Sequence, residues 1–157
     1  MSSIDRAVRT ASPQAYGPSP LTRNERPRVL LVDDNKSILD SASTILAREC
    51  VIVGTASDGK SALEAAARLR PDVIVLDISM PDMCGLDVIA RLQEAGSEAA
   101  VVFLTIHGEE EIVRAARETG AAGYVLKPRL AADLPVAALR AAEGCRFASS
   151  SIPDDLW

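Results

Sequence analysis

The chain has 157 residues, of which 48% are hydrophobic and 25% are charged, and this balance allows one domain with a packed core. Its formal net charge of −5 excludes a general electrostatic attraction for nucleic acid. The sequence contains neither an apolar run of the ~18 residues that a membrane span needs nor a signal peptide, and three cysteines without metal-site or disulfide spacing favour a reducing cytoplasm.

The first 27 residues contain Ser, Pro and Arg without a sustained hydrophobic period, and we expect a disordered leader there. From residue 28 to 142, apolar runs with strand character alternate with stripes of helical spacing. Strands are predicted at 29–32, 51–56, 73–76, 101–104 and 124–126, and the helical stripes lie within 38–46, 62–69, 86–90, 112–119 and 134–141.

This strict alternation of five strands and five helices predicts an α/β domain over residues 28–142. We expect a doubly wound (βα)5 architecture, flavodoxin-like, with a parallel five-stranded sheet and helices on both faces. The first, third and fourth strands are nearly continuous apolar runs, as expected of strands covered on both sides. Residues 143–157 lack the pattern and are interpreted as a C-terminal tail.

Polar residues follow four of the predicted strands. Asp33 and Asp34 come after the first strand and Asp77 after the third, while Thr105 and Lys127 come after the fourth and fifth. The carboxyl ends of parallel strands share one edge, where open α/β folds place their chemistry. Three carboxylates suit Mg²⁺, and one of them can attack phosphorus while a hydroxyl and an ammonium stabilise phosphoryl oxygens. Each residue alone has an ordinary explanation, so the prediction depends on their joint placement.

The segments around these residues resemble the receiver domain of two-component response regulators. The likeness covers about residues 28–142, and residues 120–127 resemble the NarL/LuxR-type subfamily. The matching segments are Val-Asp-Asp-Asn at 32–35, Leu-Asp-Ile-Ser-Met-Pro-Asp at 76–82 with Gly85, Leu-Thr at 104–105 and Gly-Tyr-Val-Leu-Lys-Pro at 123–128.

The resemblance implies a signalling module rather than a turnover enzyme. Asp77 would be the phosphoacceptor, and its donor would be a histidine kinase or a histidine phosphotransfer protein. Asp34, Asp77 and the backbone carbonyl of Ser79 would bind Mg²⁺, with Asp33 assisting through water. Thr105 and Lys127 would contact the phosphoryl group.

The resemblance also implies a switch. Thr105 would turn toward a phosphoryl oxygen and vacate space into which the ring of Tyr124 rotates inward. That movement would repack a surface for a downstream protein or a second copy of the chain. A cis peptide is implied between Lys127 and the following proline. Ile106 stands where the family carries a small residue and is expected to crowd the phosphoryl site, and His107 is expected to be a solvated loop residue.

Two other interpretations need weighing. Residues 54–61 match the P-loop pattern G-x-x-x-x-G-K-[ST] and would suggest an NTPase. We disfavour it because Thr55 and Ala56 resemble a strand end and Asp58 would place a carboxylate against the phosphate. The chain could also be the receiver part of a DNA-binding transcription regulator whose helix-turn-helix is absent here. Residues 144–157 are too few for that motif, so we expect protein partners and no direct contact with nucleic acid or membrane.

Overall fold

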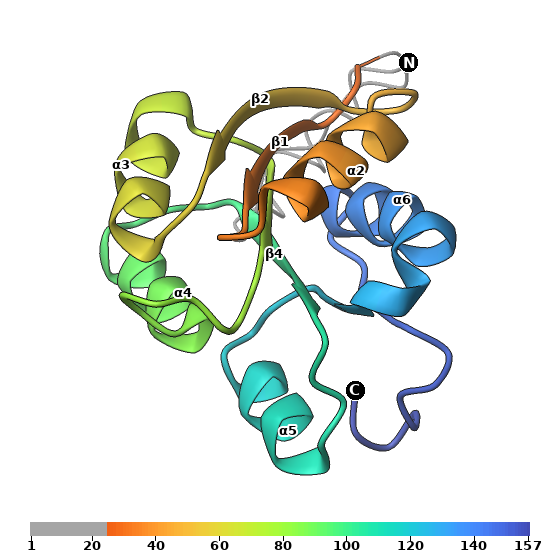
Figure 1. Ribbon diagram of the computed structural model, residues 1–157. Helices are drawn as coiled ribbons and strands as arrows, with labels where there is room; N and C mark the ends of the chain where they lie inside the picture. The colour runs from red at the N-terminus through yellow and green to blue at the C-terminus, as the bar shows by residue number, and fades with distance from the viewer. Residues whose placement is uncertain (1–24) are drawn as a thin grey trace, which may run out of the picture.

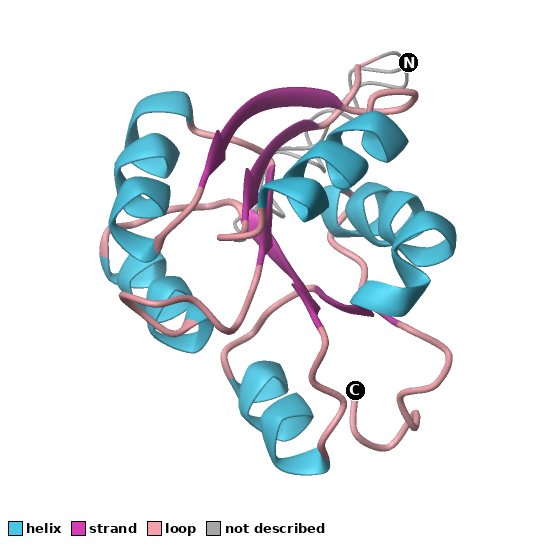
Figure 2. Cartoon of the chain, in the orientation of Figure 1, coloured by secondary structure: helices cyan, strands magenta, loops and turns pink. Residues whose placement is uncertain are grey.

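The computed structural model describes residues 25–157, so the predicted leader lies almost wholly outside the described residues. Six parallel strands form one sheet in the order β2-β1-β3-β4-β5-β6 (Figures 1 and 2). The strands are β1 Arg28–Val32, β2 Val51–Ala56, β3 Val73–Leu76, β4 Ala100–Thr105, β5 Gly123–Leu126 and β6 Phe147–Ala148. The helices are α2 Lys36–Leu46, α3 Gly59–Leu69, α4 Gly85–Glu94, α5 Glu110–Glu118 and α6 Leu130–Ala142, with a 3₁₀ turn, η1, at Lys127–Arg129.

The helices cover both faces of the sheet, which confirms the predicted doubly wound architecture. Figure 1 shows α3, α4 and α5 on one side and α2 and α6 on the other. Successive residues of a strand point to opposite faces, so Leu30 packs in the core with α3, α4 and α5 while Leu31 packs with α2 and α6. None of the helices within residues 25–157 is both long and apolar enough to cross a membrane.

The start of α3 excludes the P-loop interpretation. Thr55 and Ala56 belong to β2, so the segment is extended strand where a phosphate-binding loop would have to curl. The backbone N–H of Gly59 donates to Oδ1 of Asp82 at 2.9 Å, and that of Lys60 donates to Oδ2 at 3.1 Å. These hydrogen bonds hold the pKa of Asp82 below its ordinary value. The N–H groups that a P-loop would turn toward phosphate are therefore already bonded to a carboxylate.

The residues after α6 pack against the domain, which corrects the predicted count of five strands. β6 pairs in parallel with β5, since the N–H of Phe147 donates to the carbonyl of Ala122 at 3.0 Å and that of Ser149 to Tyr124 at 2.9 Å. Two apolar side chains further along, Ile152 and Leu156, are only 4% and 6% exposed. What the sequence presented as an unpatterned tail is thus part of the packed structure.

Candidate functional site

Two neighbouring strands place the acidic residues close together. Asp33 directly follows β1 and Asp77 directly follows β3, and the N–H of Asp77 donates to the carbonyl of Val32 at 3.0 Å. Asp33 and Asp77 are 2% and 3% exposed, whereas Asp34 is exposed. The three residues can offer carboxylate oxygens that all lie within 4.8 Å of one another. The predicted acidic group is therefore assembled at the carboxyl edge of the sheet.

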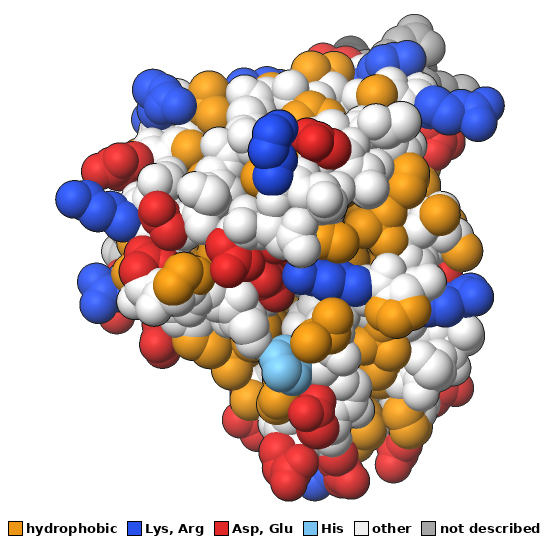
Figure 3. All heavy atoms as spheres, viewed as in Figure 1, with side chains coloured by type: hydrophobic (Ala, Val, Ile, Leu, Met, Phe, Trp, Pro, Cys, Tyr) orange, Lys and Arg blue, Asp and Glu red, His pale blue; other side chains and the backbone are white. Residues whose placement is uncertain are grey.

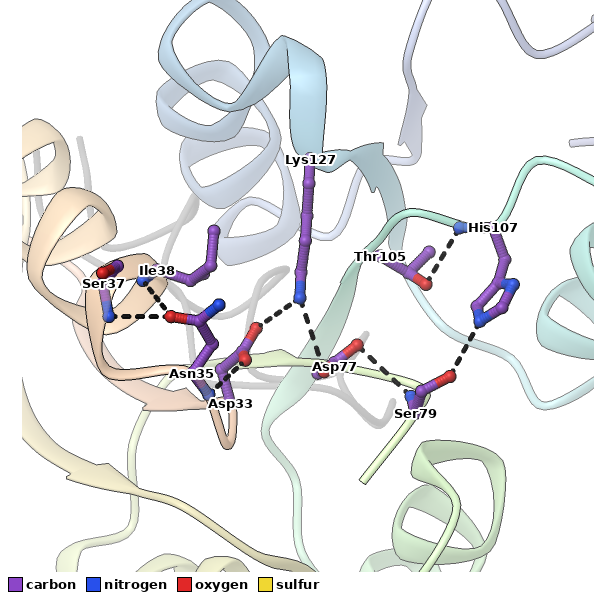
Figure 4. Close-up of polar contacts among 9 residues, drawn as sticks. All are labelled: Asp33, Asn35, Ser37, Ile38, Asp77, Ser79, Thr105, His107 and Lys127. Carbon is purple, nitrogen blue, oxygen red and sulfur yellow. Dashed lines mark hydrogen bonds and ion pairs between the residues drawn. The ribbon is translucent and has the colours of Figure 1, made fainter. Parts of the chain in front are cut away.

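Lys127 reaches into this group from the end of β5. Its Nζ lies 2.9 Å from Oδ2 of Asp33 and 3.5 Å from Oδ2 of Asp77, between the two carboxylates in Figure 4. Burial works to lower the pKa of Lys127, but its hydrogen bonds and charge interactions with both carboxylates outweigh burial and raise it. The lysine is thus held as an ammonium ion in a site that excludes most water.

Asp77 is a destabilised anion in this environment. Burial is the main cause that raises its pKa, and the charge of Asp33 adds to it, while Lys127 and the N–H of Ser79 oppose the rise. Such a carboxylate gains from any further cation. The available donors are all oxygens and one carboxylate faces solvent, which fits Mg²⁺, a hard ion that commonly takes one or two carboxylates and retains several waters.

The loop between β3 and α4 is fixed close to the acceptor carboxylate. The N–H of Ser79 donates to Oδ1 of Asp77 at 3.2 Å, and the N–H of Gly85 donates to the carbonyl of Ile78 at 2.7 Å. A Cβ atom on Gly85 would lie 2.3 Å from the backbone oxygen of Asp77. Only glycine permits this close approach, and it explains why the family motif includes that position.

His107 is a loop residue as expected, but its side chain is only 26% exposed and it joins several parts of the site. Its backbone N–H donates to Oγ1 of Thr105 at 3.2 Å, and its carbonyl accepts from the hydroxyl of Tyr124 at 2.7 Å. Its Nε2 lies 2.7 Å from Oγ of Ser79, while Nδ1 lies 3.5 Å from a carboxylate oxygen of Glu109 (Figure 4 for Ser79 and Thr105). Ser79 and His107 are 28 residues apart, so this contact depends on the fold that brings their loops together.

Three expectations drawn from the resemblance need correction. The ring of Tyr124 is already fully buried, with its centroid 6.3 Å from that of Phe103, so an inward rotation is not available from this state. The peptide bond after Lys127 is trans, since the described residues contain no cis bond, and Nζ reaches both carboxylates from the start of η1. Ile106 is 70% exposed and its side chain points into solvent, so it does not crowd the site.

A shallow groove of about 620 Å³ opens beside the site. Its lining includes Asp34, Ser79, Cys84 and His107, so it gives solvent and small molecules access to the exposed part of the acidic group. On the face shown in Figure 3, acidic side chains gather over α5, whose first turn carries Glu110 and Glu111. The site therefore combines buried charges with an open side toward water.

Known proteins are similar to this chain in sequence and in structure. Residues 29–139 match the response regulator receiver domain. The chain is 34% identical over 126 residues to the nitrate/nitrite response regulator protein NarL of Escherichia coli K12, covering 79% of this chain and 58% of that protein. It is 39% identical over 127 residues to the transcriptional regulatory protein PrrA of Mycobacterium tuberculosis, covering 80% of this chain and 54% of that protein.

A solved structure gives the same result for the fold. The signal receiver domain of the putative response regulator NarL from Mycobacterium tuberculosis superposes with a TM-score of 0.73 at 34% identity, covering 76% of this chain and 98% of that one. The chain spans little more than half the length of the two curated relatives. Receiver domains are signalling rather than catalytic modules. The chain belongs to the response regulator receiver domain family.

Proposed function

We propose that the chain accepts a phosphoryl group on Asp77 from a histidine kinase or a histidine phosphotransfer protein in a two-component phosphorelay. The observation that carries this proposal is the buried Asp77 carboxylate, 3.5 Å from the Lys127 ammonium, in a receiver domain. A carboxylate oxygen would attack phosphorus while the bond from phosphorus to the donor's imidazole nitrogen breaks. The imidazole keeps the electron pair, and an acyl phosphate forms on Asp77.

The neighbouring groups have roles that follow from their chemistry. Mg²⁺ would be held by Asp33, Asp34, Asp77 and the backbone carbonyl of Ser79, and when bound it neutralises charge on the phosphoryl oxygens. The Lys127 ammonium neutralises one further negative charge. The Thr105 hydroxyl, which is fully buried at the end of β4, would donate to a phosphoryl oxygen.

Phosphorylation with a small donor tests the proposal directly. Acetyl phosphate with Mg²⁺ should add one phosphoryl group to the protein, measured by intact mass. Asp77→Asn should abolish the adduct, because the amide is not a nucleophile, while Asp34→Ala should slow its formation. Asp87→Asn, which changes an exposed carboxylate on α4, serves as the matched control and should be phosphorylated normally. An adduct that persists in Asp77→Asn would contradict the assignment.

The surface through which phosphorylation would act on a partner is a separate question from the phosphoacceptor. We infer that phosphorylation changes a protein-binding surface around α5, β5 and α6, used by a downstream protein or a second copy of the chain, in the cytoplasm. The relatives' names favour a second candidate, in which this receiver controls a DNA-binding transcription regulator. A gene that continues into a helix-turn-helix domain, or sequence-specific DNA binding by these 157 residues at physiological salt, would favour that candidate.

A further inference from the structure

The C-terminal segment, residues 145–157, wraps around the outer edge of β5 from one layer of the fold to the other. Phe147 packs against the core formed by α2 and α6, whereas Ile152 and Leu156 are buried in the core formed by α3, α4 and α5. Figure 1 shows the segment running from the end of α6 and finishing beside α5. The segment therefore covers the edge strand and one side of α5 with the chain's own residues.

A few anchors hold this segment. Its backbone pairs with β5 over two residues, and the side-chain hydroxyl of Ser149 accepts from the N–H of Leu126 at 3.1 Å. The remaining contacts include the packing of Phe147, of the buried Ile152 and Leu156 and of Trp157, while residues 150, 151 and 153–155 are exposed. A segment with so few anchors opens locally at a small fraction of the cost of unfolding the domain.

Trp157 is the anchor that touches the functional site's own residues. Its ring centroid lies 5.5 Å from that of Tyr124 at an interplanar angle of 53°, and the guanidinium of Arg146 lies 4.8 Å above the indole. The indole N–H is buried and has no acceptor among residues 25–157. An unpaired buried donor makes this packed position less favourable than the ring contacts alone imply.

A continuous series of contacts joins Asp77 to Trp157. Asp77 accepts from the N–H of Ser79, whose hydroxyl contacts the His107 ring at 2.7 Å. The carbonyl of His107 is held by the Tyr124 hydroxyl at 2.7 Å, and Tyr124 packs against Trp157. The N–H of His107 is meanwhile bonded to the Thr105 hydroxyl, the group that would turn toward a phosphoryl oxygen.

We propose that the C-terminal segment is an intramolecular cap on the edge of β5 and the adjoining side of α5, which phosphorylation of Asp77 loosens so that this surface becomes accessible. This inference rests on the proposed function. When Thr105 turns to the phosphoryl group, its oxygen moves away from the His107 N–H, which loses this hydrogen bond, and the loop of His107 shifts. Tyr124 follows its acceptor, and Trp157 loses the ring against which it packs. The cap and a partner then compete for one surface.

The chain's one tryptophan reports on the cap without a label. Beryllofluoride with Mg²⁺, which mimics the phosphoryl group, should shift Trp157 emission to the red and raise its acrylamide quenching about twofold or more, as expected when an indole leaves a packed site for water. Asp77→Asn should give neither change. Full phosphorylation of Asp77 by acetyl phosphate, measured by intact mass, with the emission and quenching of Trp157 unaltered in the same sample, would overturn the cap and leave the phosphoacceptor proposal standing. Failure of acetyl phosphate to phosphorylate Asp77 would overturn both.

Thermodynamic linkage provides a second, independent test of the cap. If the cap and the phosphorylated state oppose each other by one coupling factor, weakening the cap must tighten beryllofluoride binding by up to that factor. Ile152→Ala and Trp157→Ala each remove one anchor and should raise affinity by about fivefold, measured by calorimetry. Asp155→Ala, an exposed position of the same segment, should match the wild type. Equal affinity for beryllofluoride in the wild type and all three variants would overturn the proposal. Because two different anchors are removed in separate variants, the test still holds if one of the two variants fails to fold.

Discussion

Replacing Lys127 with Met tests the electrostatic account of the site. The substitution keeps the length of the side chain but removes an ammonium that contacts two buried carboxylates at 2.9 and 3.5 Å. Breaking a buried ion pair by removing one partner costs roughly 3–5 kcal/mol, because the other charge remains buried. The Lys127 side chain retains 15% of its exposure, so some screening persists and the lower end applies. We expect the substitution to lower the free energy of unfolding by about 3 kcal/mol at neutral pH, which corresponds to a decrease of about 10 °C in Tm for a domain of this size.

The sign of the pH dependence follows from the direction of each pKa shift. The pKa of Lys127 is raised in the folded protein, so its stabilising contribution is complete below its ordinary value of 10.5 and disappears as the pH rises through the raised value. The pKa of Asp77 is also raised, and removing the ammonium raises it further. Folding then favours protonated Asp77. The loss in the free energy of unfolding caused by Lys127→Met should therefore be largest near neutral pH and should shrink as the pH falls toward 3.8, the ordinary pKa of Asp.

Urea denaturation from pH 7 down to pH 4, without divalent cations, measures both effects. The matched control is Lys60→Met, which removes an exposed lysine of the same length and should cost less than about 0.5 kcal/mol. The double variant Lys127→Met/Asp77→Asn should recover more than half of the loss, because it leaves one buried carboxylate unpaired instead of two. A loss below about 1 kcal/mol at pH 7, or one that does not depend on pH, would refute the reasoning.

Three further predictions use the same structure. Gly85→Ala should destabilise the protein by about 2–4 kcal/mol in urea denaturation, and should slow phosphorylation, because its Cβ would lie 2.3 Å from the backbone oxygen of Asp77. Ile106→Ala should leave the rates of phosphorylation by acetyl phosphate and of dephosphorylation within about twofold, since the side chain is 70% exposed, and a tenfold acceleration of both would restore the crowding idea. Thiol titration at pH 8 should modify exposed Cys145 in the folded protein but spare Cys50, whose pKa is raised by burial to about 11, and equal rates would contradict that burial.

The core of the site could be predicted because buried parallel strands are easy to identify in a sequence. Both faces of such strands are covered, so they are continuous apolar runs whose ends are marked by the first polar residue. Asp33, Asp77 and Lys127 are those first polar residues, and Thr105 closes its strand. The parallel arrangement of the strands then brings these residues together, because the carboxyl ends of all parallel strands lie at one edge of the sheet.

The features that the sequence did not predict depend on contacts between distant segments. β6 has two residues, too few for any period, and it forms because β5 would otherwise expose unpaired backbone groups at the sheet edge. The burial of Ile152 likewise depends on the core that α3, α4 and α5 form. The buried position of the Tyr124 ring was not predicted for a related reason, since the space beside it is shared with Trp157, more than 30 residues further along.

The hydrogen bonds around Thr105 decide which way the switch runs. In the structure its hydroxyl oxygen accepts from the N–H of His107 at 3.2 Å, a long contact between neutral groups, and such bonds contribute about 0.5–1.5 kcal/mol. A hydroxyl that donates to a charged phosphoryl oxygen makes a charge-assisted bond of about 1.5–3 kcal/mol in a buried site. The two bonds use different parts of the hydroxyl, so they compete only when a turn toward the phosphoryl group carries the Thr105 oxygen away from His107. If Asp77 is phosphorylated as proposed, we expect that turn to be favourable and to leave the His107 N–H without its partner, so that the loop between β4 and α5 responds first. The buried ring of Tyr124 would follow, because its hydroxyl is bonded to that loop.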